Sequence, residues 1–174
     1  MARRLIPAAQ RPVAAGIVAE WLIEEWAHLY PDWAHSAAVA ELLDSGHDGH
    51  PPCTWLLFEG SDDIETAVLG SIGLSFGGEL EPSADAEALV PDGIWVVNLF
   101  VTPAARGHGH GTALLAHAVE HATTLGIGTL LLTTEHSAMH YRSLGWVDIG
   151  TAELNGHRST NMRLALGTGS AMAR

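Results

Sequence analysis

The sequence contains no lysine: all eight of its basic residues are arginine, against 20 acidic residues among 174. The formal net charge at pH 7 is therefore −12. Proteins that bind nucleic acid or anionic membranes present clusters of basic side chains, so we expect neither partner for a chain this acidic. An acidic surface favours a cationic or amine-bearing partner, although it also serves simply to keep a protein in solution.

Cysteine and long apolar runs are also scarce. Cys53 is the only cysteine, which excludes an intrachain disulfide, and the apolar run beside it favours a buried, unreactive thiol. No segment reaches the roughly 18 consecutive apolar residues of a membrane span. Arg3 and Arg4 are not followed by the clean apolar stretch of a secretion signal, so we expect a cytoplasmic protein.

The chain does contain a large apolar fraction, 47%, with 16% charged residues. This balance is typical of a globular protein, and the length is that of one domain with a substantial core. We predict a single domain over residues 1–166, followed by a small, polar tail over residues 167–174 that frays.

The most informative stretch covers residues 94–126. Residues 94–101 form an apolar run with the length and composition of a buried strand, and Pro103 ends it because proline cannot donate to a strand ladder. Arg106 then precedes three alternating glycines, after which apolar residues recur at helical spacing over residues 114–122. The glycines are Gly107, Gly109 and Gly111. The sequence thus predicts a strand, a glycine-rich turn and a helix in succession.

Such a turn concentrates backbone N–H groups at one point. The first turn of a helix has donors without intrahelical acceptors, and the helix dipole favours negative charge there. Glycine lets the backbone approach a bulky anion because it carries no Cβ. The pattern predicts a phosphate or pyrophosphate site at the start of the helix, to which Arg106 would add positive charge and several donors.

Three kinds of anion loop compete for this stretch. A P-loop requires a lysine, which the chain lacks. A dinucleotide fingerprint requires a third glycine where Thr112 stands and a carboxylate about 20 residues on, where residues 127–129 have none. The remaining pattern, R-x-x-G-x-G over residues 106–111, resembles the coenzyme A pyrophosphate loop of the GNAT N-acetyltransferase superfamily. A connector without function is the alternative, but strand, arginine, glycines and helix occur together in the right order.

Hydrophobic periodicity and turn signals predict the other elements. Pro31 ends the first helix and Ser36 caps the second, while Ser137 and Gly145 bound a short late helix. Asn155–Gly156 is a strong hairpin signal. The predicted strands cover residues 3–6, 54–59, 67–76, 129–134, 147–154 and 159–166, and the predicted helices cover residues 11–29, 36–43 and 138–144. This mixture favours an α/β (α+β) sheet with helices on both faces.

Two acidic connections interrupt this pattern. Residues 60–65 form a turn between two strands, and residues 77–93 form a long connection into the central strand. Loops this long inside a compact domain are usually functional or disordered. The longer segment therefore either rims an acceptor site or is a surface excursion.

A second motif adds to the resemblance. A-M-H-Y-R-S-L-G-W, residues 138–146, is similar to the A-x-x-F-Y-x-x-x-G-F signature that closes the GNAT core, and it follows the loop at the right distance. The element order up to about residue 166 also matches that fold. His140 stands where the family often has phenylalanine, and Glu135 and His136 occupy the region of its usual asparagine. The segment around L-T-T-E-H further resembles a branch that includes protein N-terminal acetyltransferases.

The resemblance implies a fold, a cosubstrate and a set of binding residues. The GNAT fold has a central, mixed, mostly antiparallel sheet that splays at strands four and five, and its cosubstrate is acetyl-CoA. The pantetheine arm would pair with the central strand like an added strand, and the pyrophosphate would rest on the amides of the loop. The implied cofactor-binding residues are Leu99, Phe100, Val101, Arg106, Gly107, His108, Gly109, His110, Gly111, Thr112 and Tyr141.

The implied chemistry is direct attack of an amine on the thioester. The backbone N–H of Leu99 would stabilise the tetrahedral oxyanion, a role typically worth ~3 kcal/mol. Tyr141 would be the general acid that protonates the leaving thiolate, since a phenol and a thiol have comparable pKa values. The alternative role for Tyr141 is packing against Trp146.

The general base is left open among several residues. Glu25, on the first helix, is the residue we name for this role, with Glu24, Asp92 and His136 as other candidates acting directly or through water. An amine that arrives already deprotonated needs no base. No metal site is expected: His108 and His110 are predicted to carry exposed rings on the loop, and the loop around His47 more often binds nothing.

We therefore predict an acetyl-CoA-dependent N-acetyltransferase that acts on a primary amine, either a small molecule or a protein N-terminus. The alternative is a non-catalytic acyl-CoA-binding regulatory module with the same fold. The resemblance also implies that a homodimer is a common assembly, although the sequence indicates no interface. Acceptor pockets carry no portable sequence code, so the acceptor is not predicted.

Overall fold

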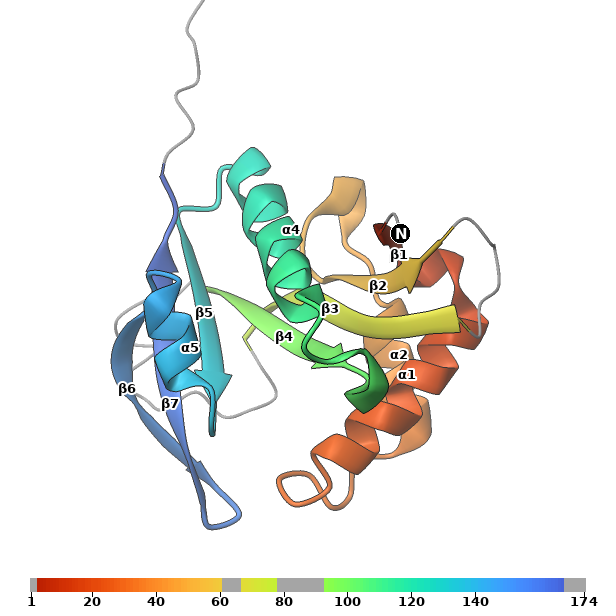
Figure 1. The fold of residues 1–174 in the computed structure, drawn as a ribbon, viewed down its shortest axis with the longest axis horizontal. Coiled ribbons are helices and arrows are strands. Elements are labelled where there is room, and N and C mark those ends of the chain that lie inside the picture. The colour runs from red at the N-terminus through yellow and green to blue at the C-terminus, as the bar shows by residue number, and fades with distance from the viewer. Residues whose placement is uncertain (1–2, 61–66, 78–92, 168–174) are drawn as a thin grey trace, which may run out of the picture. The chain divides into compact units, whose positions relative to one another are not determined.

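The computed structural model describes residues 3–60, 67–77 and 93–167 (Figure 1). The order of their helices and strands is the predicted one. The α-helices are α1 (Pro12–Glu25), α2 (His35–Leu43), α4 (His110–Thr124) and α5 (Ala138–Ser143), and the 3-10 helices are η1 (Ala8–Gln10), η2 (His47–Gly49) and η4 (Pro103–Ala105). The strands are β1 (Arg3–Pro7), β2 (Cys53–Glu59), β3 (Val68–Phe76), β4 (Ile94–Val101), β5 (Thr129–Thr134), β6 (Val147–Leu154) and β7 (His157–Ala165).

The seven strands are hydrogen-bonded in the order β1-β2-β3-β4-β5-β7-β6. Strands β1 and β2, β2 and β3, β5 and β7, and β6 and β7 are antiparallel, whereas β4 and β5 are parallel. The predicted mixed, mostly antiparallel sheet is confirmed. Pairing of β4 with β5 joins Ile94 to Leu130 and Trp95 to Leu131. These two pairs lie at the start of β4.

The chain divides into two compact units. The first comprises the described parts of residues 1–74 and 97–118, and the second those of residues 75–96 and 119–174. The single domain over residues 1–166 stays a prediction. The acidic segments 61–66 and 78–92, and residues 168–174 of the predicted tail, lie outside the described residues. In the part of the chain that is described, no helix combines the length and the apolar character needed to cross a bilayer.

The core of the first unit forms where α1 and α2 pack on β2 and β3. Ala15, Val18 and Leu22 of α1 are fully buried, and Leu56 and Phe58 of β2 belong to the same apolar cluster. Alternate residues of a strand point to opposite faces of its sheet. Trp55, next to Leu56, accordingly contacts His117 of α4 at 4.8 Å between ring centroids. Helices therefore cover both faces of β2, as predicted.

Two predicted helix ends are wrong. The helix predicted over residues 11–29 ends at Glu25, because Trp26 leaves the helical region with φ −111° and ψ 19° before Pro31 is reached. Ser36, predicted to cap α2, lies inside that helix, and Ala34 occupies the cap position without a side-chain hydrogen bond.

The second unit is built around β5, β6 and β7. Leu130 and Leu131 of β5, Met162 of β7 and Trp146 are almost wholly buried. Asn155 and Gly156 join β6 to β7 with φ of 48° and 77°, and two positive φ values in succession define the predicted hairpin turn. Gly145 follows α5 with φ 91°, so the predicted glycine at the end of this helix is confirmed.

Candidate functional site

Strand β4 is kinked at Asn98. Its φ of 54° lies in the left-handed region, which asparagine tolerates better than most residues with a Cβ. Two contacts hold it there: Nδ2 of Asn98 donates to Oε1 of Glu41 at 2.8 Å, and the hydroxyl of Ser71 donates to the Asn98 carbonyl at 2.7 Å. The kink directly precedes Leu99, whose N–H is the predicted oxyanion donor, so it sets the direction of that N–H.

The residues after the kink are fixed from one side by β3. A Cβ built on Gly70 would lie 2.2 Å from the Phe100 carbonyl oxygen, so the two backbones approach each other closely. The ring of Phe100 is buried and contacts Trp21 at 5.9 Å between centroids. Phe100 thus belongs to the core through its side chain, which leaves only its backbone for the predicted cofactor contact.

The glycine-rich loop leads from η4 into α4, which begins at His110. Gly107 and Gly109 have φ of 81° and 76°, values that strain a residue with a Cβ. The first backbone bond of the helix runs from the N–H of Ala113 to the Gly109 carbonyl at 3.1 Å. The N–H groups of residues 110–112 precede that bond, so they have no intrahelical acceptor.

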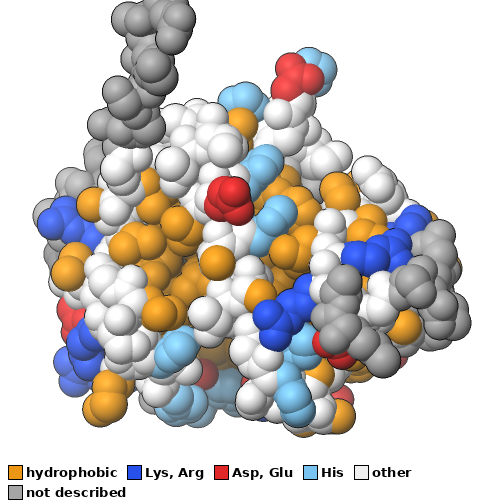
Figure 2. All heavy atoms as spheres, turned by 45° about the horizontal axis from the view of Figure 1, so that its top comes forward, with side chains coloured by type: hydrophobic (Ala, Val, Ile, Leu, Met, Phe, Trp, Pro, Cys, Tyr) orange, Lys and Arg blue, Asp and Glu red, His pale blue; other side chains and the backbone are white. Residues whose placement is uncertain are grey.

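The local charge around the loop differs from that of the whole chain. The first turn of α4 carries no acidic residue. Arg3 and Arg106 both contact the loop or its flanks, and Arg106 is also the ion-pair partner of Glu25. On the face shown in Figure 2, acidic side chains are scattered rather than gathered into one patch. Because charges beyond ~10 Å are largely screened, the net charge of −12 is compatible with an anion site at this helix start.

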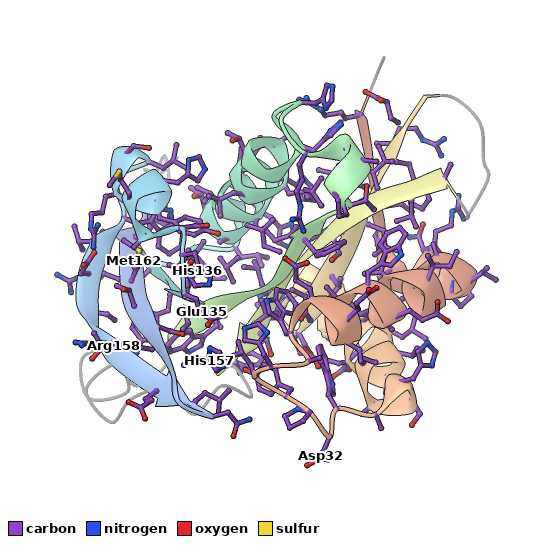
Figure 3. The ribbon with its side chains drawn as sticks, turned by 60° about the horizontal axis from the view of Figure 1, so that its bottom comes forward. Asp32, Glu135, His136, His157, Arg158 and Met162 are labelled. Carbon is purple, nitrogen blue, oxygen red and sulfur yellow. The ribbon has the colours of Figure 1, made fainter. Side chains whose placement is uncertain are left out.

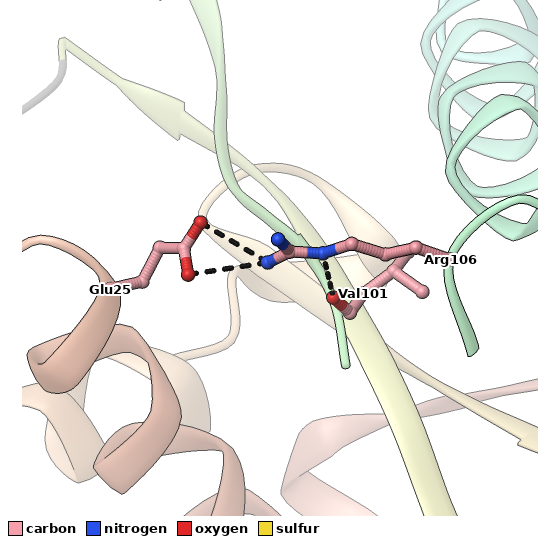
Figure 4. Close-up of polar contacts among 3 residues, drawn as sticks. All are labelled: Glu25, Val101 and Arg106. Atoms are coloured by element: carbon pink, nitrogen blue, oxygen red, sulfur yellow. Dashed lines mark hydrogen bonds and ion pairs between the residues drawn. The ribbon is translucent and has the colours of Figure 1, made fainter. Parts of the chain in front are cut away.

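Arg106 joins the loop to helix α1 (Figure 4). Its Nε donates to the Val101 carbonyl at 2.9 Å, and its Nη2 donates to both carboxylate oxygens of Glu25 at 3.1 and 3.2 Å. The guanidinium also lies over the Phe100 ring, 5.5 Å from its centroid. Its predicted contact with pyrophosphate stays a prediction, and Glu25, the predicted base, is its ion-pair partner.

His110 differs from expectation. The prediction that both loop histidines carry exposed rings is wrong for His110, which is 4% exposed, and right for His108. Nε of Arg3, on β1, donates to Nδ1 of this buried histidine at 3.1 Å. No local pattern in the sequence indicated Arg3, since 107 residues separate the two partners.

Tyr141 belongs to the second unit, on α5. Burial raises the pKa of its phenol above the ordinary value of 10. Its ring meets Trp146 edge-on, 6.0 Å between centroids, and its carbonyl accepts the N–H of Trp146 at 3.1 Å. The predicted packing against Trp146 is therefore present. The role of Tyr141 as a proton donor stays a prediction.

The other candidate bases have different surroundings. Glu24 and His136 are exposed, and Asp92 lies outside the described residues. In the second unit, Figure 3 shows Glu135 and His157, with Nδ1 of His157 3.4 Å from Oε1 of Glu135. This contact involves neither Glu24 nor His136.

The chain is similar to known proteins in sequence pattern and in fold. The family model described as "Acetyltransferase (GNAT) family" matches residues 17–146. No curated protein sequence matches the chain at a significant level. Two solved structures of similar fold are the ribosomal-protein-S18-alanine N-acetyltransferase from Escherichia coli (17% identity, 99% of each chain covered, TM-score 0.61) and Arabidopsis thaliana NAA60 in complex with acetyl-CoA (12% identity, 95% of this chain and 99% of that one, TM-score 0.63).

A third is an aminoglycoside 6'-N-acetyltransferase complexed with coenzyme A (16% identity, 95% of this chain and 97% of that one, TM-score 0.66). At these identities the similarity shows the fold alone. In this chain, the kinked β4, the glycine-rich loop and α4 occur in the predicted order. The family match covers most of the chain and includes both sequence motifs. The chain therefore belongs to the GNAT acetyltransferase family.

Proposed function

We propose that this protein is an acetyl-CoA-dependent N-acetyltransferase that acts on a primary amine, either a small molecule or a protein N-terminus. Family membership supports acetyl transfer in general. Two proteins of similar fold were solved with acetyl-CoA or coenzyme A bound, which supports the choice of donor.

The observation that carries the proposal is the loop from Arg106 to Thr112. Gly107 and Gly109 hold positive φ, and a Cβ on Gly107 would meet nothing within 4 Å, so the backbone there is open to a ligand. The amides at the start of α4 lack intrahelical acceptors, and the helix dipole adds a positive partial charge at the same end. These groups suit the diphosphate of coenzyme A, with the pantetheine arm along Leu99 to Val101.

In the proposed reaction, the amine nitrogen attacks the carbonyl carbon of the acetyl thioester. The resulting oxyanion accepts a hydrogen bond from the Leu99 N–H. The C–S bond then breaks, and the coenzyme A thiolate takes the phenolic proton of Tyr141, which bulk water returns. The amine gives up its extra proton to a base, and the products are the N-acetylated acceptor and free coenzyme A.

Tyr141 suits this role because its phenol is protonated over the whole physiological range. Burial raises its pKa, so the group that must donate a proton keeps it until the thiolate forms. For the base we propose Glu25. Because Arg106 holds that carboxylate, proton transfer to it requires the ion pair to loosen. An amine that arrives already deprotonated is the alternative.

The test is release of free thiol from acetyl-CoA with a panel of amines: N-terminal peptides, polyamines and aminoglycosides. We expect turnover with at least one class, and we expect Tyr141→Phe to lose most of that rate while coenzyme A binding, measured by calorimetry, is retained. Coenzyme A binding without turnover on any acceptor would favour the regulatory module. Absence of coenzyme A binding would contradict both.

A further inference from the structure

Arg3, the first described residue of β1, contacts the glycine-rich loop at two points. Its Nη2 donates to the His108 carbonyl at 2.6 Å, and its Nε donates to Nδ1 of His110 at 3.1 Å. The same Nη2 lies 3.6 Å from where a Cβ on Gly109 would be. One guanidinium therefore spans three consecutive residues of the loop, although more than 100 residues separate it from them along the chain.

These contacts matter because they act on carbonyl groups. In a loop that binds an anion, N–H groups face the anion and carbonyl groups must face away from it, since their oxygens carry negative partial charge. Arg3 holds the His108 carbonyl, and the N–H of Ala113 holds the Gly109 carbonyl. With both carbonyl groups bound elsewhere, the peptide units between His108 and His110 are fixed in one orientation.

The contact with His110 fixes the start of α4. An acceptor nitrogen carries no proton, so the neutral imidazole that accepts from Arg3 holds its proton on Nε2. The ring is 4% exposed and is therefore held by packing as well as by the guanidinium. Because His110 is the first residue of the helix, Arg3 ties the helix start to the edge strand β1.

We propose that Arg3 is a positioning residue for the diphosphate of the donor: through the His108 carbonyl and the His110 ring it keeps the loop amides directed at that group. The inference rests on the proposed function, because it concerns the same loop. It adds that affinity for the donor depends on a residue of β1, which lies outside the residues matched by the family model.

The discriminating experiment compares two donors that differ in the diphosphate. Acetyl-CoA carries it and S-acetyl-pantetheine does not. In Arg3→Gln we expect KM for acetyl-CoA and the Kd of coenzyme A to rise roughly tenfold, as for loss of hydrogen bonds from a charged donor. We expect kcat with acetyl-CoA to stay within about twofold, and kcat/KM with S-acetyl-pantetheine to be unchanged.

Two further variants control for charge and for folding. Arg4→Gln removes the same charge from the next residue of β1, whose side chain points to the other face of the strand, and we expect coenzyme A affinity close to wild type. Arg3→Lys keeps the charge without the planar pair of donors, so we expect it to recover less than half of the lost binding free energy. Each variant is purified through a C-terminal tag and its thermal midpoint is recorded.

The outcomes separate the two proposals. If wild type binds coenzyme A and Arg3→Gln binds it equally well, the positioning role is wrong and the proposed function stands. The same holds if Arg3→Gln weakens use of both donors equally, or if Arg4→Gln has the same effect as Arg3→Gln. If wild type itself does not bind coenzyme A, the proposed function fails and this inference fails with it.

Discussion

The side-chain amide of Asn98 donates to the carboxylate of Glu41 across 2.8 Å, and this bond joins a kinked residue of β4 to helix α2. A residue in the left-handed region costs roughly 1–2 kcal/mol unless its surroundings support it, so the bond helps to keep the kink. The Leu99 N–H follows directly, and its proposed role depends on the direction that the kink gives it.

Substitutions at Asn98 should separate conformation from hydrogen bonding. Asn98→Gly keeps the left-handed backbone but loses the bond to Glu41, whereas Asn98→Ala loses both. We expect Asn98→Ala to be less stable than Asn98→Gly by about 1 kcal/mol in denaturant unfolding. In Asn98→Ala we also expect kcat to fall by a larger factor than the factor by which KM for acetyl-CoA rises. Equal stability of the two variants would show that the kink is not strained.

A second prediction concerns the proposed base. If Glu25 accepts the proton of the amine, Glu25→Gln should lower kcat/KM by about a hundredfold or more. Glutamine can still accept hydrogen bonds from Arg106, so it preserves most of the contact in Figure 4. A change of only severalfold in Glu25→Gln, with a larger loss in Glu25→Ala, would assign Glu25 to holding Arg106 instead.

The pH dependence of Tyr141 follows from the direction of its pKa shift. Burial raises the pKa of the folded phenol above 10, and the proton-donating form is the neutral one. We therefore expect no fall in kcat from phenol ionisation below about pH 10. The unfolded state loses this proton first, so stability should decrease as pH rises from 10 through the folded pKa. Tyr141→Phe should remove that part of the decrease, as followed by thermal unfolding between pH 9 and 11.

The local parts of the site were predictable from sequence. The glycine-rich turn between β4 and α4 lies where its pattern indicated, and β4 has the predicted bounds. These features depend on neighbouring residues, so periodicity and turn chemistry suffice to find them. The same is true of the Asn155–Gly156 turn.

The long-range parts were not predictable. Asn98 reads as one polar residue inside an apolar strand, and nothing near it in sequence indicates Glu41, 57 residues away. Arg3 donates to the buried His110, which lies 107 residues away along the chain. Contacts between distant segments follow from packing, for which one sequence carries no local signal.

A substitution at Gly70 tests how closely β3 and β4 approach, with one at Gly16 as its control. An added Cβ at Gly70 would lie 2.2 Å from the Phe100 carbonyl oxygen, so backbone must move. We expect Gly70→Ala to lose about 1–3 kcal/mol of stability and to weaken coenzyme A binding. Gly16→Ala, inside α1, meets nothing within 4 Å and should gain about 0.5–1 kcal/mol. If Gly70→Ala unfolds like wild type, the close approach is not a constraint.

The last prediction concerns the reactivity of the Cys53 thiol. Burial raises the pKa of this thiol from 9.0 to about 11, although the Leu74 backbone N–H partly offsets the shift. The thiolate is the reactive form, so a two-unit shift lowers its fraction about a hundredfold at pH 8. We expect native protein to react with a disulfide reagent about a hundredfold more slowly than protein unfolded in guanidinium at the same pH, with Cys53→Ser as the blank. Equal rates would contradict the burial.

The same shift in the pKa of Cys53 affects stability. Because the folded thiol binds its proton more tightly than the unfolded one, stability should also fall as pH rises from about 9 toward 11.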